Sequence, residues 1–215
     1  MAALIESRAR GQADAKRDRA ERMRAWEQSQ LRLIAEFPDQ PLAYEGLLCV
    51  AQQHPDAEQA ARIAGQLIAT TATPNWVARK AQELLDRQKL LGKALESVLP
   101  EALRGESDGP ISVGAPIVIY AWSLDRSDSL MIADRFAAAA PEGAKMFGIC
   151  LDTDVDLARQ VARQANLPGQ QVFDDGGPLG LVAQRLMISE VSTAYLVGAD
   201  GTIRSVTYHH TLLRR

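Results

Sequence analysis

The sequence predicts an α/β fold, an open mixed sheet flanked by helices on its faces, preceded by an all-α region. Glycine usage changes along the chain, because four of the fifteen glycines precede residue 93 and eleven follow it. The first part consists of amphipathic segments separated by prolines, whereas the second alternates short apolar runs with such segments. We therefore divide the chain into a helical N-terminal region, residues 1–92, and an α/β domain, residues 93–215.

The helical region is predicted to hold one long charged helix and about three short ones. Residues 3–36 are rich in Ala, Arg, Glu and Gln, which favour helix. Prolines then interrupt the chain before each of three segments, 41–53, 56–70 and 74–90. Such short helices in sequence resemble the stacked helical hairpins of tetratricopeptide arrays, although the repeat period is irregular.

The α/β domain is predicted because short apolar runs typical of strands alternate with segments typical of amphipathic helices. The run PIVIYAW is apolar throughout, which is typical of a central strand buried on both faces. GESDGP, residues 105–110, indicates a turn. The expected order is β-α-β-α-β-α-β-β, with strands at 116–122, 145–151, 171–173, 193–197 and 202–209 and helices at 126–140, 154–166 and 178–187.

Composition excludes several classes of function. The chain has 215 residues with a net charge of −3, so no general basic surface recruits nucleic acid. The arginines of the first helix alternate with acids, which favours a solvated face. No run approaches the roughly 18 apolar residues of a membrane span, and the first residues do not resemble a signal peptide. We expect a cytoplasmic chain as given, or a periplasmic or envelope one if it is part of an exported protein.

The cysteines and histidines do not form a recognisable metal or disulfide pattern. Cys49 and Cys150 lie 101 positions apart, so there is neither a CxxC pair nor a disulfide framework. A Cys/His zinc site would need nearly all of these side chains and the three histidines to converge. The aspartates at 152, 154 and 156 lack the glycine and distal glutamate of a calcium loop, so helix capping is expected. We expect no metal and no cofactor. The three histidines are His54, His209 and His210.

Three segments carry a resemblance to a known family. IVIYAWSLDRS (117–127) resembles the strand that leads into Phe-Trp-Ala-x-Trp-Cys-x-x-Cys, and FGICLD (147–152) resembles the next strand with its trailing Asp. VSTAYLVGADG (191–201) resembles Ile-Pro-Thr-x-Phe-Leu-Ile-Asp-x-Asp-Gly. The chain thus resembles the thioredoxin-like superfamily, closest to TlpA-like thiol–disulfide oxidoreductases and the peroxiredoxin-like group. The resemblance is strong over 115–207 and loose over 35–114.

The sequence departs from this family at the residues that do its chemistry. The family places two cysteines at a helix N-terminus, where the helix dipole lowers the pKa of the attacking thiol. One alignment register puts Leu124 and Ser127 at these positions, and the other puts Ser123 and Arg126 there. The family's cis-proline falls at Ser192. A cis peptide before a non-proline residue costs about 2.5–4 kcal/mol, so we expect a trans bond.

These departures predict a redox-inactive binding or adaptor module of the cell-envelope type, with a protein or peptide partner. The alternative is a thiol-dependent oxidoreductase or peroxidase that uses Cys150 or Cys49, although we expect buried, inert thiols at both positions. A third hypothesis is a structural part of a longer exported protein. The predicted groove comprises the degenerate active-site positions Trp122, Ser123, Leu124, Asp125, Arg126, Ser127, Ser192 and Thr193.

Overall fold

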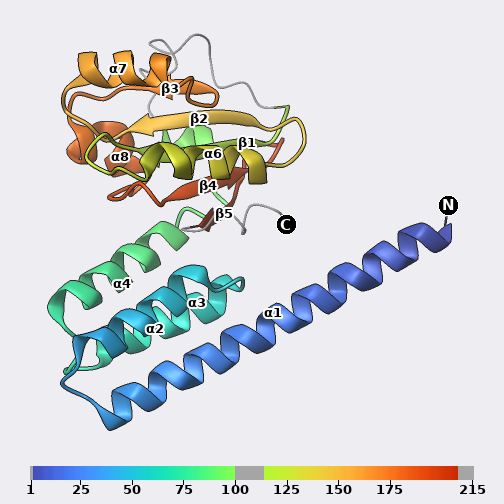
Figure 1. The fold of residues 1–215 in the computed structure, drawn as a ribbon, viewed down its shortest axis with the longest axis vertical. Coiled ribbons are helices and arrows are strands. Elements are labelled where there is room, and N and C mark those ends of the chain that lie inside the picture. Colours follow the sequence, from blue (N-terminus) through green and yellow to red (C-terminus); the bar gives the residue numbers. More distant parts are fainter. Residues whose placement is uncertain (1, 100–113, 208–215) are drawn as a thin grey trace. The chain divides into compact units, whose positions relative to one another are not determined.

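A computed structural model describes residues 2–99 and 114–207 (Figure 1). The chain divides into two compact units, Met1–Leu85 and Asp86–Arg215, each described here by itself. Within the described ranges, no helix is both long enough and apolar enough for a bilayer crossing. The turn expected at 105–110, the end of the last expected strand, and His209 and His210 lie outside the described residues.

The first unit consists of the helices predicted from the sequence, and the breaks between them fall at the prolines, as predicted. Pro41 occupies the first turn of its helix, where a missing N–H costs nothing. The Asp56 carboxylate caps the next helix by accepting from the backbone N of Glu58 at 2.9 Å. The helices are α1 (Ala2–Glu36), α2 (Pro41–Gln53), α3 (Ala57–Ala69) and α4 (Asn75–Gln88), which ends just inside the second unit.

Apolar side chains at helical spacing close the core of the first unit. Leu47, Ile63, Leu67 and Val77 are all at most 1 % exposed. α1 packs against α2 and extends well beyond α2 and α3 toward the N-terminus (Figure 1).

The second unit is a five-stranded mixed sheet in the order β3-β2-β1-β4-β5. β1, β2 and β3 run parallel, while β4 is antiparallel to both of its neighbours. The carboxyl ends of β1, β2, β3 and β5 therefore lie at one edge of the sheet, beside the amino end of β4. The strands are β1 (Ile117–Trp122), β2 (Lys145–Cys150), β3 (Gln170–Val172), β4 (Ala194–Val197) and β5 (Ile203–Thr207).

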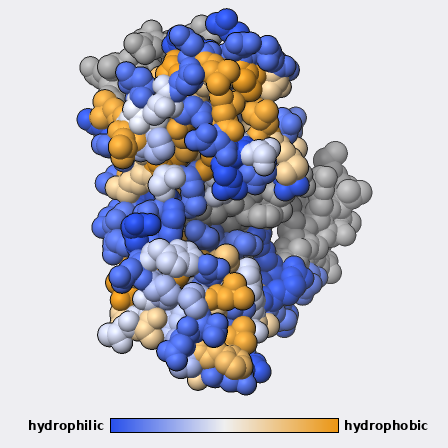
Figure 2. Space-filling view, turned by 60° about the vertical axis from the view of Figure 1, so that its left-hand side comes forward, coloured by the Kyte–Doolittle hydropathy of each residue, from blue (hydrophilic) through white to orange (hydrophobic). Residues whose placement is uncertain are grey.

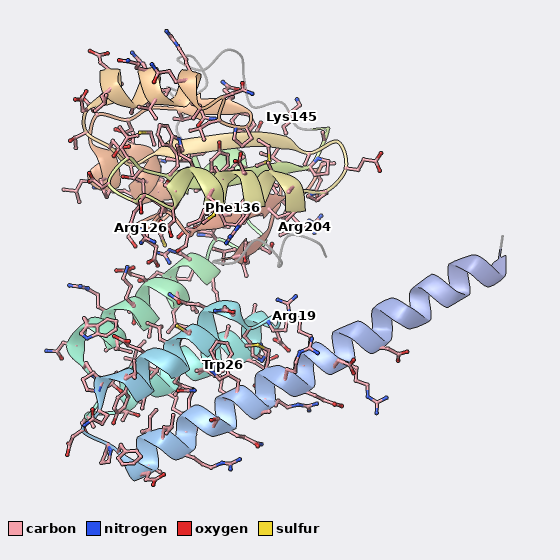
Figure 3. The ribbon with its side chains drawn as sticks, in the orientation of Figure 1. Arg19, Trp26, Arg126, Phe136, Lys145 and Arg204 are labelled. Carbon is pink, nitrogen blue, oxygen red and sulfur yellow. The ribbon has the colours of Figure 1, made fainter. Side chains whose placement is uncertain are left out.

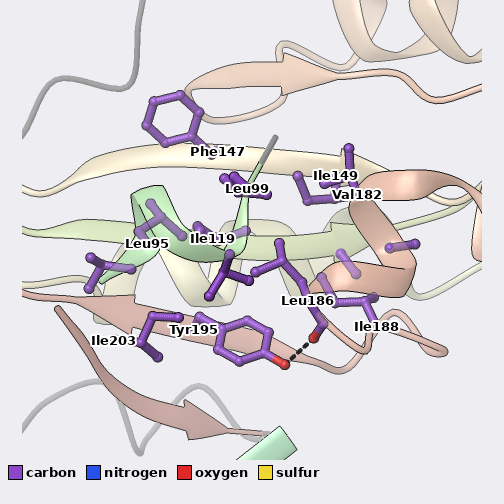
Figure 4. Packing of buried hydrophobic residues seen from close by; sticks show 14 of the residues in the cluster. Leu95, Leu99, Ile119, Phe147, Ile149, Val182, Leu186, Ile188, Tyr195 and Ile203 are labelled. Carbon is purple, nitrogen blue, oxygen red and sulfur yellow. Dashed lines mark hydrogen bonds between the residues drawn. The ribbon is translucent and has the colours of Figure 1, made fainter. Parts of the chain in front are cut away.

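Helices cover both faces of this sheet. α6 (Ser129–Ala139) and α7 (Val155–Gln164) pack on the face that holds alternate β1 residues such as Tyr120 and Trp122. α5 (Leu95–Val98) and α8 (Leu181–Arg185) pack on the other face. In that second layer the Tyr195 hydroxyl donates to the backbone carbonyl of Leu186 (Figure 4).

The expected order of strands and helices is confirmed, with three local differences. The helix expected from residue 126 begins at Ser129, because residues 123–128 form a turn. The helix expected at 178–187 is divided into the 3₁₀ turn η2 (Gly177–Leu179) and α8, since the extended backbone of Gly180 interrupts it. α5 was not expected. It follows Ala94, which forms an isolated β-bridge with Thr202, the residue just before β5.

Candidate functional site

The positions that the resemblance aligns with the family's cysteine motif lie at the carboxyl end of the central strand β1 and in the turn after it. Trp122, the last residue of β1, is fully buried. Its ring meets the edge of Phe173 at a centroid distance of 6.1 Å and an interplanar angle of 88°. The guanidinium of Arg159 lies 5.3 Å from the Phe173 centroid. Trp122 is therefore a packing residue beneath the site rather than part of an open groove.

A closed network of hydrogen bonds fixes the turn that follows β1. The Ser123 hydroxyl donates to the Asp152 carboxylate at 2.8 Å, and the backbone N of Leu124 donates to both carboxylate oxygens at 3.0 and 2.9 Å. The backbone N of Ser123 donates to the buried hydroxyl of Ser129 at 2.8 Å. Asp152 is only 8 % exposed. The Asp152 carboxylate therefore stabilises the turn between β1 and α6, and the Ser123 hydroxyl donates its hydrogen bond to that carboxylate.

Arg126 stands on the exposed side of this turn, outside the first turn of α6 (Figure 3). Its Nε and a terminal nitrogen lie 3.1 and 3.0 Å from the two carboxylate oxygens of Asp128. This bidentate bond raises the pKa of Arg126 and lowers the pKa of Asp128. Asp128 thus offsets the positive charge of Arg126 near the N-terminus of α6.

The second side of the site is the amino end of β4. The backbone N of Ala121 donates to the Thr193 carbonyl at 3.1 Å, which extends the pairing of β1 with β4 by one residue. The peptide bond between Val191 and Ser192 is trans. The Thr193 hydroxyl is buried and has no hydrogen-bond partner among the described residues.

The structure brings the sequence-predicted site residues together but exposes only some of them. Asp125, Arg126 and Ser127 are exposed, and Leu124 and Ser192 are half-buried. The other three are buried and can shape the site only from below. They are Trp122, Ser123 and Thr193.

A buried arginine that the sequence analysis did not single out supports the loop before Ser192. Arg87 is 1 % exposed, and its Nε donates to the Met187 carbonyl at 2.5 Å. A terminal nitrogen donates to the Ser189 hydroxyl at 2.7 Å, and another lies 3.7 Å from a carboxylate oxygen of Glu190. All of these residues belong to the second unit. Arg87 looks in sequence like any solvated helix arginine, so no local signal marks it.

The two cysteines are free thiols in different settings. Cys150 is fully buried at the end of β2, and burial raises the pKa of its thiol to about 12. Cys49 is half-buried on α2, where burial and the nearby Glu45 raise its pKa. Cys49 also lines a pocket of about 530 Å³ between α1 and α2, whose apolar walls include Leu33 and Phe37.

No metal centre is evident among the residues that the structure describes, since no three His, Cys, Asp or Glu side chains are grouped to hold an ion. One of the alternating aspartates caps a helix, which is the role predicted from the sequence. The Asp154 carboxylate caps α7 by accepting from the backbone N of Leu157 at 3.1 Å.

Comparison with known proteins gave matches to solved structures alone. No protein-family model matches the chain, and no curated protein matches it. The C-terminal domain of a putative thiol-disulfide oxidoreductase from Bacteroides thetaiotaomicron aligns with 22% identity and a TM-score of 0.38, covering 44% of this chain and 69% of that one. A thioredoxin-like protein from Parabacteroides distasonis aligns with 13% identity and a TM-score of 0.38, covering 45% and 75%.

The topology of the second unit identifies its fold independently of these values. A central β1 runs into a helix, a parallel β2 follows, and a β4–β5 hairpin closes the other side of the sheet. β1, which the resemblance aligns with the strand before the family's cysteine pair, and β4, which it aligns with the strand after the cis-proline, are neighbours. The second unit therefore has a thioredoxin-like fold, and a helical region precedes it in the chain.

Proposed function

We propose that this protein is a redox-inactive thioredoxin-like binding module, whose site at the end of β1 holds a protein or peptide partner. One observation carries the proposal. The turn where the family places its attacking thiol holds Ser123 and Leu124 bonded to the Asp152 carboxylate. Neither alignment register supplies a cysteine there. Disulfide exchange needs a thiolate nucleophile, and this turn has none.

The remaining thiols give little support to the alternative enzyme. A thiol-dependent oxidoreductase or peroxidase needs a lowered thiol pKa, whereas the pKa values of Cys150 and Cys49 are both raised. Cys150 is also fully buried, so a disulfide substrate could not reach it without local unfolding.

The surface offered to a partner is small and polar. It consists of the exposed Asp125, Arg126 and Ser127 with the half-buried Ser192. The bond to Asp128 orients the Arg126 guanidinium, and the Asp152 network fixes the backbone beneath it. A preorganised surface binds with a smaller loss of conformational entropy than a flexible loop does.

The redox part of the proposal is tested by an insulin disulfide-reduction assay. We expect the native chain to show no reduction above the background of the reductant alone. The variant Leu124→Cys/Ser127→Cys restores a cysteine pair on the same scaffold and is expected to gain activity. Activity of the native chain would contradict the proposal and would make Cys150 or Cys49 catalytic.

The binding part is tested with peptides selected from a displayed random library and measured by calorimetry. Arg126→Ala should weaken a selected peptide about tenfold, the effect expected for an arginine at the centre of an interface. Arg204→Ala is the matched control, because the Arg204–Asp200 pair is as exposed, with side chains 57% and 52% accessible against 56% and 39% for Arg126–Asp128. Failure to select any peptide whose binding needs Arg126 would contradict the proposed site.

A further inference from the structure

Three leucines with exposed side chains follow the parallel strands β2 and β3. Leu157 is 47 % exposed, Leu179 78 % and Leu181 49 %. We call these three residues the leucine edge. They lie in the segments that leave the carboxyl ends of the strands, on the side toward which the β2 arrow points in Figure 1. Figure 2 turns this side forward and shows hydrophobic side chains gathered on the sheet-containing unit. Exposed apolar patches on soluble proteins commonly mark binding sites.

The two segments that carry these leucines adjoin each other where they leave the strands. β2 and β3 are parallel neighbours, so both segments start at the same edge of the sheet. The turn η2 packs directly against the loop after β2. A Cβ added to Gly177 would lie 2.9 Å from the Leu151 carbonyl oxygen and 3.2 Å from the Thr153 methyl carbon. Such close packing requires a glycine and fixes the position of Leu179 relative to that loop.

This surface also adjoins the site at the end of β1. Asp152, in the loop after β2, accepts hydrogen bonds from Ser123 and Leu124 in the turn after β1. A partner held at Arg126 could therefore continue onto the leucine edge without leaving the domain.

The charge around the leucine edge is mostly negative. Residues 151–159 and 173–181 contain five aspartates and one arginine, Arg159, whose guanidinium lies over the ring of Phe173. Asp154 caps α7, Asp174 accepts from the backbone N of Gly176 and Val182, and Asp152 is buried. Asp156 and Asp175 are exposed. The helix dipole favours acidic residues at the start of α7. Asp175 lies in a turn, so this effect does not explain its presence.

We propose that the leucine edge binds a partner-protein segment in which apolar side chains are flanked by lysine or arginine. The apolar side chains would cover the leucines, and the basic ones would face Asp156 and Asp175. This inference rests on the binding role proposed above. It adds the chemistry of the partner segment that would cover the leucine edge. Charge complementarity of this kind steers association and selects among partners.

A short fluorescein-labelled peptide of alternating leucines and lysines is the probe, and fluorescence anisotropy on the full chain is the readout. We expect it to bind and to bind more weakly as NaCl rises. A peptide with glutamate in place of lysine, and one with serine in place of leucine, should bind at least tenfold more weakly.

Variants then locate the bound peptide. Leu179→Ser/Leu181→Ser should weaken binding about tenfold, and Asp156→Asn/Asp175→Asn should weaken it about threefold and flatten its salt dependence. Leu42→Ser is the matched control, because Leu42 is 74 % exposed but lies on α2 of the first unit. All five side chains are exposed, so the variants should fold, which a thermal melt verifies.

Several outcomes would overturn the inference: unchanged binding to Leu179→Ser/Leu181→Ser, equal binding of the glutamate peptide, or loss of binding in Leu42→Ser. A native chain that is dimeric in sedimentation velocity, and monomeric as Leu179→Ser/Leu181→Ser, would make the occupant a second copy and would also overturn it. Binding that requires Leu179 but not Arg126 supports this inference even where the test of the proposed function at Arg126 fails.

Discussion

Arg87 and Met187 are a hundred residues apart in the sequence and are joined by a partly buried hydrogen bond. The Nε of Arg87 donates to the Met187 carbonyl at 2.5 Å. Met187 has a φ of 52°, the left-handed conformation that ends α8. Its backbone N donates to the Gln184 carbonyl at 3.0 Å, and the N of Ile188 donates to the Ala183 carbonyl at 2.7 Å, which together form a Schellman motif. Arg87 thus holds the helix end that leads into the loop before Ser192.

Replacing Arg87 by leucine should destabilise the protein strongly. The Met187 carbonyl would lose its donor and the half-buried Glu190 would lose its cation, and breaking such a buried pair costs about 3–5 kcal/mol. Urea unfolding followed by circular dichroism measures the change. Arg185→Leu, an exposed arginine at the end of α8, is the control and should change the free energy of unfolding by less than about 0.5 kcal/mol.

The sequence was sufficient to predict the elements whose signal is local. The unbroken apolar run of β1 predicted a central strand, and Pro41 and Asp56 marked helix starts that the structure confirms. Arg87 could not be predicted, because its partners lie about a hundred positions away and only the tertiary fold brings them together. The start of α6 at Ser129 also depends on a long-range partner, since Asp152 holds the turn that delays the helix.

The sequence predicted the strand end at which the proposed site residues lie, but not which of their side chains are exposed. Both alignment registers put the relevant residues at the end of β1, where the structure has them. Alternation along the strand and the bonds to Asp152 then decide which side chains reach solvent, so Trp122 is buried while Arg126 is exposed. The pattern of residue types does not predict which of these side chains is exposed, because either of two neighbouring residues at the end of a strand can face solvent.

Two glycine-to-alanine substitutions should have opposite effects on stability. Gly169 has a φ of 76°, and a Cβ there would lie 2.1 Å from the Met146 carbonyl oxygen, so Gly169→Ala should destabilise by about 2–4 kcal/mol. Gly65 lies inside α3 with no atom within 4 Å of an added Cβ, so Gly65→Ala should stabilise by about 0.5–1 kcal/mol. Urea unfolding of both variants tests the signs. Two shifts in the same direction would contradict the backbone argument.

Removing the Asp152 carboxylate should loosen the turn that carries the site. Asp152→Ala leaves the Leu124 amide and the Ser123 hydroxyl without their acceptor, and unpaired buried donors cost about 1–3 kcal/mol each. We expect a loss of about 2 kcal/mol in urea unfolding and faster hydrogen exchange at the Leu124 amide. Asp152→Asn keeps one oxygen acceptor and should lose about half as much. Asp175→Ala, exposed in a turn, should leave both measurements nearly unchanged.

The Cys150 thiol should be unreactive in the folded protein and should make stability fall at high pH. Its pKa is raised from 9.0 to about 12, so at pH 8 its thiolate fraction is about a thousandfold below that of an ordinary cysteine. Iodoacetamide labelling followed by mass spectrometry should modify Cys49 first and Cys150 only in urea. Rapid labelling of folded Cys150 would revive the enzyme hypothesis.

The raised pKa of the Cys150 thiol also makes the free energy of unfolding depend on pH. Above about pH 9 the unfolded chain releases the thiol proton while the folded protein retains it, so the free energy of unfolding falls as pH rises toward 12. Cys150→Ala lacks this contribution, and its stability should decline less steeply over that window. Tyr120, whose pKa is also raised by burial, is present in both chains and cancels in the comparison. Parallel stability curves for the two chains would show that the thiol is not desolvated.

The boundary between the two units can be tested with two fragments. The change in glycine usage predicts that the α/β domain begins at residue 93, but the side chains of Arg87 and Leu90 are buried in the second unit. A fragment of residues 86–215 keeps both, whereas residues 93–215 lose the buried arginine and a core leucine. Each loss is of the order of 2–5 kcal/mol, so the shorter fragment should unfold at markedly lower urea. Equal midpoints for the two fragments would place the boundary at Gly92 and would show that Arg87 contributes nothing to the folding of the thioredoxin-like domain.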